Sequence, residues 1–341
     1  MKNRINLSNF NIRTDLIIDH KIEEKYTTTN IINEYLKVTT IEIDNPLSKE
    51  LQKKEGTYIT IEFTDITNHE DKLEIEKCLT NEIKKLLCKL KIGPNAEGLI
   101  IGLGNRFSTP DSLGPKCIDK ILITRHLFIL NTNVKEGIRP ISAITPGVMA
   151  NTGIESFEII ESIIKKINPK FIIAIDALAS SSIDRINKTI QLTDTGIHPG
   201  SGVGNHRKEL SKDTLGIPII SIGVPTVVES TIIVNDTINY LFKHISYLKN
   251  NYESSKLVLK RNKEYKNKIK DLELNDNEKK EISGIIGTLT EEEKKSLINE
   301  VLKSIHYDMI VTPKEIDFLI DKLSETLANS INKSLHLALN D

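Results

Sequence analysis

The stretch Lys170-Phe-Ile-Ile-Ala-Ile-Asp176 decides the fold class of this chain, because it is a short apolar run that ends in an acid. Two similar runs are Glu97-Gly-Leu-Ile-Ile-Gly-Leu103 and Ile217-Pro-Ile-Ile-Ser-Ile-Gly223. Such runs are typical of strands buried on both faces, which lie in a parallel sheet covered by helices. Helical patterns occupy the intervening stretches, at residues 111–128, 153–167 and 226–248. The alternation predicts the α/β class, with a layered core around a mostly parallel sheet.

The flanks of this core add a strand and further helices. Residues 57–63 alternate apolar and polar side chains, which predicts a strand with one solvent-exposed face. Residues 70–90 have the spacing of an amphipathic helix, and residues before about 55 carry only weak strand signals. The capping-box patterns Thr290-Glu-Glu-Glu293 and Thr312-Pro-Lys-Glu315 predict the starts of two C-terminal helices.

The composition excludes several classes of protein. The chain has 341 residues with 46 Lys and Arg against 47 Asp and Glu, so it lacks the basic excess of a nucleic-acid binder and we expect no direct nucleic-acid partner. The three cysteines fit no CxxC spacing, which indicates reduced thiols and no metal cluster. Because the sequence has neither an apolar run of about 18 residues nor a signal peptide, we expect a soluble cytoplasmic protein without a membrane partner.

Two acidic residues follow buried strands of the predicted sheet. Asp111 lies in the loop Gly102-Leu-Gly-Asn-Arg-Phe-Ser-Thr-Pro-Asp111, and Asp176 ends its strand. Because the carboxyl ends of parallel strands meet at one edge of a sheet, where ligands bind, we expect the two carboxylates to face one another across a cleft. The alternatives are a helix N-cap for Asp111 and, for Asp176, a carboxylate satisfied by helix amides. The loop lacks the third glycine of a dinucleotide fingerprint.

The Asp111 and Asp176 pair suits two kinds of chemistry. Two carboxylates that share a site do not ionise together easily, so one keeps its proton and the pair can act as acid and base on a water molecule. The same pair suits a cation, for which His198 in the loop Asp194-Thr-Gly-Ile-His-Pro-Gly-Ser-Gly-Val-Gly-Asn205 is a third candidate ligand. A hydrogen-bonding role is the plainer interpretation of His198. Ser201 has no nucleophile motif around it, so the residues leave open a hydrolase-type core and a ligand-binding core.

These loops resemble those of the germination protease family, the spore endopeptidases that degrade small acid-soluble spore proteins. The resemblance covers essentially the whole chain, with a poor match at residues 20–55 and 250–282. The stretches that carry it most clearly are Thr109-Pro-Asp-Ser-Leu-Gly-Pro115, Ala174-Ile-Asp-Ala-Leu-Ala179, His198-Pro-Gly-Ser-Gly-Val-Gly-Asn205 and Ile222-Gly-Val-Pro-Thr-Val-Val228.

The resemblance implies a fold, an assembly and a mechanism. The family core is similar to hydrogenase-maturation peptidases and forms a homotetramer, and its two essential aspartates fall on Asp111 and Asp176. The family is classed as metallopeptidase in some schemes and as atypical aspartic peptidase in others. We favour the aspartic interpretation without a cofactor, because the sequence shows no compact set of three metal ligands. The alternatives are a metal-assisted peptidase, with a divalent metal on Asp111, Asp176 and His198, and a non-catalytic peptide-binding protein.

The resemblance also implies a self-processing zymogen. Arg13-Thr-Asp-Leu16 matches the family's activation site, so a cut between Asp15 and Leu16 would remove the first 15 residues. This segment is polar and terminal, and we expect it to be easily exposed. The implied organisation is a pro-segment at 1–15, an α/β catalytic core at 16–248, a charged variable segment at 249–282 and a helical C-terminal extension at 283–341 packed on the core.

Substrate contacts within the expected cleft are assigned to two loops. We expect Asn105 and the glycine-rich loop around His198, with Gly200, Ser201 and Gly202, to stabilise the oxyanion or to bind the substrate. The expected function is that of an endopeptidase in the cytoplasm of the spore core, whose partners are small acid-soluble spore proteins.

Overall fold

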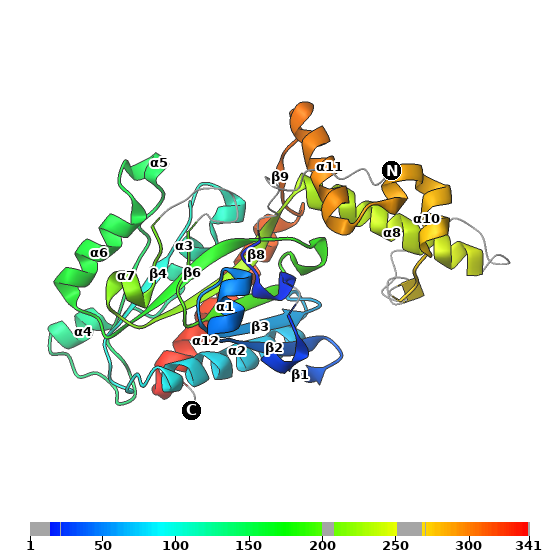
Figure 1. Cartoon of the computed structure of the whole chain (residues 1–341). Helices are drawn as coiled ribbons and strands as arrows, with labels where there is room; N and C mark the ends of the chain where they lie inside the picture. The colour runs from blue at the N-terminus through cyan, green and yellow to red at the C-terminus, as the bar shows by residue number, and fades with distance from the viewer. Residues whose placement is uncertain (1–13, 21, 200–207, 251–267, 270, 340–341) are drawn as a thin grey trace. The chain divides into compact units, whose positions relative to one another are not determined.

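The computed structural model describes residues 14–20, 22–199, 208–250, 268–269 and 271–339 (Figure 1). The chain forms two compact units. The larger unit contains Arg13–Val227 and Thr312–Asp341, and the smaller one contains Val228–Val311. The candidate site residues that the structure describes all lie in the larger unit. The domain boundaries expected after residues 15, 248 and 282 stay a prediction.

The described residues form a nine-stranded sheet. Its strands lie in the order β1-β2-β3-β7-β8-β6-β4-β5, and β9 (Ile310–Val311) pairs with the end of β8. The bounds of the eight strands on the main path are β1 (Thr27–Asn33), β2 (Leu36–Ile43), β3 (Gly56–Phe63), β4 (Gly98–Gly102), β5 (Ile141–Ile144), β6 (Phe171–Ser180), β7 (Thr189–Thr193) and β8 (Ile219–Glu229).

The sheet is mixed, with a parallel side and an antiparallel side. β4 runs parallel to both β5 and β6, whereas β1, β2, β3, β7 and β8 are joined by antiparallel pairs. The α/β class is therefore confirmed, but the sheet is not mostly parallel. The difference comes in part from β1 and β2, which lie before residue 55, where strand signals are weak. These strands join β3 in an antiparallel meander.

The three apolar runs form β4, β6 and β8, as predicted, and they are buried throughout their apolar parts. Two of these strands are longer than expected, because β6 continues to Ser180 and β8 to Glu229. Asp176 therefore lies inside β6 and not at its end, which corrects the sequence-based prediction. Its position relative to the end of β4 is nevertheless the expected one, as described below.

Helices cover both faces of the parallel side of the sheet (Figure 1). One core cluster joins Ile173 and Ile175 of β6 to α2 (His69–Lys89), α3 (Leu113–Ile118) and α12 (Ile316–Leu335). A second cluster joins Ile172 and Ala174 of the same strand to α6 (Ser156–Ile167). Successive side chains of a strand point to opposite faces, so β6 supplies both layers. The layered core is thus confirmed.

The solvent-exposed face expected for β3 is wrong. Residues 57–61 and Phe63 are buried, and Glu62 is half-buried. On one face of the strand, Ile59 and Ile61 pack in the cluster that contains α2. On the other face, Tyr58 packs with Ile17, Ile41, Ile43 and Leu47. Alternation predicts burial on one side only, but a second small apolar cluster covers the opposite side of β3.

The two predicted C-terminal capping boxes have different outcomes. Thr290 caps α11 (Glu291–Ser304) as predicted, because its side chain accepts the N–H of Glu293 and the Glu293 side chain accepts the N–H of Thr290. The box at Thr312 is wrong, since α12 begins at Ile316. The Thr312 hydroxyl instead donates to the Thr226 carbonyl at 2.8 Å, which holds this stretch to β8.

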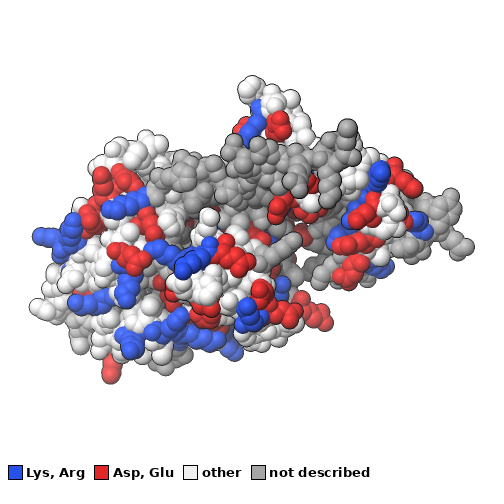
Figure 2. All heavy atoms as spheres, viewed as in Figure 1, with Lys and Arg blue, Asp and Glu red and all other residues white. Residues whose placement is uncertain are grey.

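The smaller unit is largely helical, with α8 (Ser230–Asn250), α10 (Asp276–Ser283) and α11. The remaining α-helices of the larger unit are short, namely α1 (Asn45–Leu51), α4 (Arg125–Ile129), α5 (Met149–Thr152) and α7 (Lys212–Leu215). No helix in the described part of the chain has both the length and the hydrophobicity that a membrane span requires. On the face shown in Figure 2, basic and acidic side chains of the larger unit are intermixed.

Candidate active site

Three glycines fix the loop that follows β4. A Cβ atom on Gly102 would lie 2.5 Å from the carbonyl oxygen of Gly114, and one on Gly114 would lie 2.2 Å from that of Leu103. Gly104 has a φ of +106°, and its Cβ would lie 2.1 Å from the carbonyl oxygen of Asp111. Real side chains cannot approach backbone atoms so closely, so these positions require glycine. The start of α3 and Asp111 are thereby packed directly on the end of β4.

Asp111 is held by the same loop. It ends the 3₁₀ helix η3 (Thr109–Asp111), it is half-buried, and its Oδ2 accepts the backbone N–H of Asn105 at 2.8 Å. Ser112, not Asp111, occupies the N-cap position of α3. The N-cap alternative for Asp111 is therefore wrong, because its carboxylate closes the loop after β4 instead.

Asp176 is a buried acid in β6, with 5% of its surface exposed. Its Oδ1 accepts the backbone N–H of Ala177 at 2.9 Å. The last backbone hydrogen bond between β4 and β6 runs from the N–H of Leu103 to the carbonyl of Ile175, at 2.8 Å. Asp176 is thus the first residue of β6 beyond the end of β4, which is the sheet edge that the sequence indicated.

The elements that carry the two aspartates lie next to each other, because η3 packs against β6. Asp111 belongs to the loop that leaves β4, and Asp176 lies just past the point where β4 stops pairing. The structure brings the two residues to one edge of the sheet, and their action as a pair stays a prediction.

Asn105 contributes to the shape of this loop. Its side-chain oxygen accepts hydrogen bonds from the N–H of Phe107 and from Nδ2 of Asn151, both at 3.0 Å. Because its backbone N–H already serves Asp111, its Nδ2 is the donor that an oxyanion role would use. That role stays a prediction.

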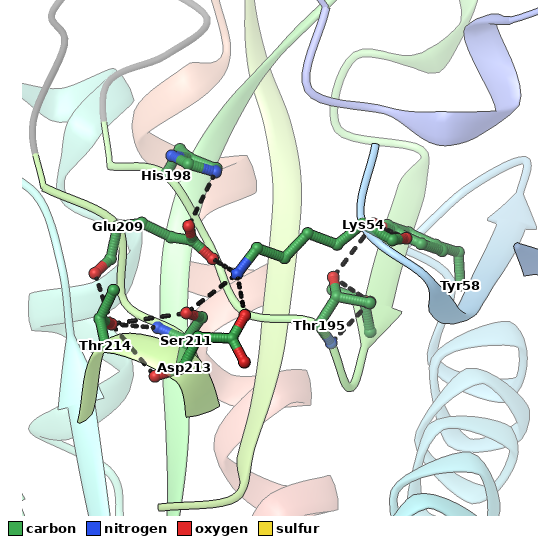
Figure 3. Close-up of polar contacts among 9 residues, drawn as sticks. Lys54, Tyr58, Thr195, His198, Glu209, Ser211, Asp213 and Thr214 are labelled. Carbon is green, nitrogen blue, oxygen red and sulfur yellow. Dashed lines mark hydrogen bonds and ion pairs between the residues drawn. The ribbon is translucent and has the colours of Figure 1, made fainter. Parts of the chain in front are cut away.

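His198 lies in a group of ion pairs formed with Lys54, Glu209 and Asp213 (Figure 3). Its Nε2 is 3.5 Å from Oε2 of Glu209, and 57% of its side chain is exposed. Lys54 Nζ contacts Glu209 at 2.5 Å and Asp213 at 2.6 Å. Burial lowers the pKa of Lys54, but the hydrogen bonds with Asp213 and Glu209 outweigh this effect, so the pKa is raised. His198 therefore contacts the carboxylate of Glu209, whose charge is already balanced by Lys54.

A metal set of Asp111, Asp176 and His198 is not assembled. Within the residues that the structure describes, which include all three, no three His, Cys, Asp or Glu side chains are grouped closely enough to hold a metal ion. The metal alternative therefore does not fit the positions of these side chains. Gly200, Ser201 and Gly202, the other expected loop residues, lie outside the described part of the chain.

The expected activation site is half-buried at Thr14 and Asp15 and buried at Leu16 and Ile17. Leu16 and Ile17 both have 0% of their surface exposed. Asp15 donates its N–H to the carbonyl of Ala179 at 3.2 Å, and its Oδ2 accepts the N–H of Ala179 at 2.9 Å. Of the segment expected to be easily exposed, residues 1–13 lie outside the described part of the chain, and Thr14 and Asp15 are half-buried. The residues just after the expected cut are packed in the core of the larger unit.

Four residues that hold this N-terminal segment were not singled out from the sequence. The Gln191 carboxamide accepts the N–H of Ile17 at 2.7 Å and donates to the carbonyl of Asp15 at 3.2 Å. Asp19 and Arg185 form an ion pair, and the charges of Asp15 and Asp19 act on the nearby Lys53. The one available signal was a polar Gln in the middle of a β-branched run, Thr189-Ile-Gln-Leu-Thr193.

Comparisons with known proteins agree over the whole length of the chain. The family model described as germination protease matches residues 15–341. The germination protease of Priestia megaterium is 42% identical over 98% of this chain and 96% of its own length. Those of Bacillus cereus and Bacillus velezensis are 44% identical with the same coverage.

A solved structure is also similar, that of the NiFe hydrogenase maturation protease HycI from Thermococcus kodakarensis. It has 19% sequence identity and covers 42% of this chain and 80% of its own, with a TM-score of 0.28. At this score the likeness supports nothing further, and the fold class rests on the strand pairing described above.

Proposed function

Because this chain belongs to the germination protease family, and is therefore a peptidase, we propose that it cuts small acid-soluble spore proteins at internal peptide bonds during spore germination. The observation that carries the proposal is the location of Asp111 and Asp176. Both lie at the edge of the sheet where β4 ends, one fixed by a backbone N–H and the other buried in β6.

The proposed mechanism uses the two aspartates on one water molecule. One carboxylate removes a proton from the water as it attacks the scissile carbonyl, and the other, protonated, polarises that carbonyl or protonates the leaving amine. In a site shared by two carboxylates, the second ionisation is opposed by the first charge, which favours this division. The proposed mechanism uses no metal and gives no role to the His198 imidazole, whose Nε2 lies 3.5 Å from Oε2 of Glu209.

The developing oxyanion is proposed to be stabilised by Asn105 and the glycine-rich loop that starts at His198. Asn105 is assigned this role because its backbone N–H donates to Asp111, which places the residue next to the proposed catalytic carboxylate.

We further propose that the chain is made as a zymogen and cuts itself between Asp15 and Leu16. The support is the family match and the position of Asp15, which contacts Ala179 of β6, the strand that also carries Asp176. A homotetramer of the spore core is also proposed. The nearly equal numbers of basic and acidic residues favour contact with spore proteins over contact with nucleic acid.

The test is cleavage of a purified small acid-soluble spore protein by Asp111→Asn and Asp176→Asn variants. Each change should lower the rate by roughly 10²- to 10⁴-fold, because it removes one proton-transfer group. Asp317→Asn, at an exposed position of α12, is the matched control and should cut like the wild type. Wild-type rates in both Asn variants would exclude the pair, and activity that a chelator removes and one divalent ion restores would exclude the metal-free mechanism.

A further inference from the structure

Asp19 is a buried acid that the proposed catalytic pair does not use. Its side chain has 0% of its surface exposed, and it pairs with the guanidinium of Arg185. It also accepts the backbone N–H of Ser181 at 2.8 Å. Ser181 directly follows the last residue of β6, so Asp19 holds the end of the strand that contains Asp176.

A single hydroxyl group connects this carboxylate to the expected cleavage site. The backbone N–H of Leu16 donates to Oγ1 of Thr14 at 3.2 Å. The Thr14 hydroxyl in turn donates to the Asp19 carboxylate. Thr14 therefore lies between the backbone nitrogen of Leu16 and a buried negative charge.

A cut after Asp15 changes both ends of this connection. Hydrolysis breaks the bond between the Asp15 carbonyl carbon and the Leu16 nitrogen, and the oxygen of water completes the Asp15 carboxylate. The Leu16 nitrogen takes up protons and becomes an ammonium group. Thr14 belongs to the released peptide, so Asp19 loses a hydroxyl donor when a positive charge appears nearby.

The new terminus is held in place by contacts that the cut does not touch. The Leu16 side chain is fully buried, and the N–H of Ile17 stays within 2.7 Å of Oε1 of Gln191. A buried ammonium group without a counter-charge costs several kcal/mol, so a carboxylate must approach it or the terminus must leave the core. Asp19 is the carboxylate already connected to this nitrogen.

We propose that Asp19 receives the α-ammonium group of Leu16 after the cut and acts as a positioning residue that couples N-terminal processing to β6. The inference rests on the proposed cleavage between Asp15 and Leu16. In the zymogen, the Thr14 hydroxyl occupies this place on Asp19. In the processed chain, an ion pair replaces the hydrogen bond from the Thr14 hydroxyl and tightens the end of the strand that carries Asp176.

The other charged groups around Asp19 are compatible with an added cation. Glu62 lies 3.8 Å from Nε of Arg185, which gives that guanidinium a second carboxylate. Burial lowers the pKa of Lys53, while Asp15 and Asp19 oppose this effect. When Asp15 departs, Lys53 loses one of the two carboxylates that oppose this effect. Burial, and next the charge of Lys53, lowers the pKa of His20, so this side chain is neutral at pH 7.

The experiment compares two forms of the mature chain, released from a fusion protein so that one starts at Leu16 and the other carries two additional glycines before it. The additional residues should lower kcat on a small acid-soluble spore protein by about tenfold, which corresponds to ~1.4 kcal/mol, and should leave KM nearly unchanged. In an Asp19→Asn background, the two forms should have the same reduced kcat.

The pH profile separates a charged contact from a merely structural one. The free amine of a chain terminus has a pKa near 8, and a carboxylate partner raises it. The kcat of the Leu16 form should therefore fall as the pH rises above about 8, because the ammonium group is lost, whereas the extended form should lack this decline. If Asp19→Asn fails to fold, acetylation of the Leu16 amine in the wild-type chain should produce the same tenfold loss.

Equal kcat values and equal pH profiles for the Leu16 and extended forms would overturn the inference. Failure of the proposed function is recognised separately, because neither form would then cut the spore protein. In that case thermal unfolding decides the inference: the Leu16 form should have the higher Tm at pH 7, and the difference should vanish at pH 10. No difference in Tm at pH 7 would overturn it.

Discussion

Asp111 and His198 lie in two glycine-containing loops of the same sheet, but different forces hold the two side chains. Asp111 accepts a backbone N–H in a loop whose glycines touch backbone atoms of η3 and α3. His198 is more than half exposed and contacts Glu209 at the edge of an ion-pair group. Close packing of the backbone therefore holds the Asp111 side chain in place, whereas ion pairs hold the His198 side chain. Glycine content in the sequence does not distinguish these two situations.

The largest expected effect is that of Gly104→Ala, which tests whether packing holds Asp111. The new Cβ would meet the carbonyl oxygen of Asp111 at 2.1 Å on a backbone with φ of +106°, so we expect a loss of about 3 kcal/mol or more in unfolding free energy and a loss of cleavage. Gly153→Ala is the matched control, because Gly153 has a φ of +70° but no atom within 4 Å of the added Cβ. Urea unfolding measures the loss of unfolding free energy in both variants. Equal losses would show that the positive φ, and not the contact with Asp111, causes the destabilisation.

A smaller effect is expected from Lys54→Met, which tests whether charge holds the His198 loop. The change leaves Glu209 and Asp213 without their shared cation, and we expect it to lower the unfolding free energy by about 1 kcal/mol. The difference from the wild type should shrink in high salt, since partly exposed ion pairs are screened. Lys85→Met, which removes a simple pair with Glu82 on α2, should cost less. A loss that does not depend on salt would indicate packing instead.

Acid is expected to lower the unfolding free energy slightly, because it breaks the ion pair between Arg106 in the Asp111 loop and Asp119 after α3. The hydrogen bonds from Arg106 lower the pKa of Asp119 below its usual value. The pair therefore stabilises the folded chain above pH ~4 and loses this contribution as the pH falls through the lowered pKa. The stability difference between wild type and Arg106→Gln, under about 1 kcal/mol for so exposed a pair, should disappear below pH 4. A difference that persists at pH 2 would contradict the prediction.

The smallest effect on stability is expected from His198→Gln, at under about 0.5 kcal/mol, because the imidazole is exposed and 3.5 Å from its partner. The same variant is informative about activity. Under the metal-free mechanism we expect less than about a tenfold change in the cleavage rate, since no proton transfer passes through His198. Abolished cleavage would favour the metal-assisted alternative.

Much of the fold was readable from the sequence where burial imposes a simple pattern. The isoleucine-rich runs of β4, β6 and β8 have no polar alternation to confuse with a helix, and they lie where predicted. β1 is an exposed strand rich in Thr and Asn without a clear pattern, and β7 alternates polar and apolar residues over only five positions. Their place in the sheet follows from pairing between distant segments, which local periodicity does not encode.

The residues of the candidate site likewise fall into two groups, those that local sequence reveals and those that only distant contacts define. Asp111 and Asp176 were selected because an acid after a buried strand is recognisable locally, and the structure places both at the end of β4. Asp19 and Gln191 were missed, since their roles come from contacts with residues more than 150 positions away in the chain. A sequence alone does not distinguish a buried, hydrogen-bonded Asp or Gln from an exposed one.

The burial of Leu16 and Ile17 has a kinetic consequence. A peptide bond inside packed structure is cut only in molecules in which that segment has opened, so the processing rate is the product of the open fraction and the cutting rate. An opening free energy of about 4 kcal/mol would leave roughly one molecule in a thousand cleavable at any time. The contacts of Asp15 and Ile17 with Ala179 and Gln191 would then limit the processing rate. Weakening these contacts would make the chain mature faster.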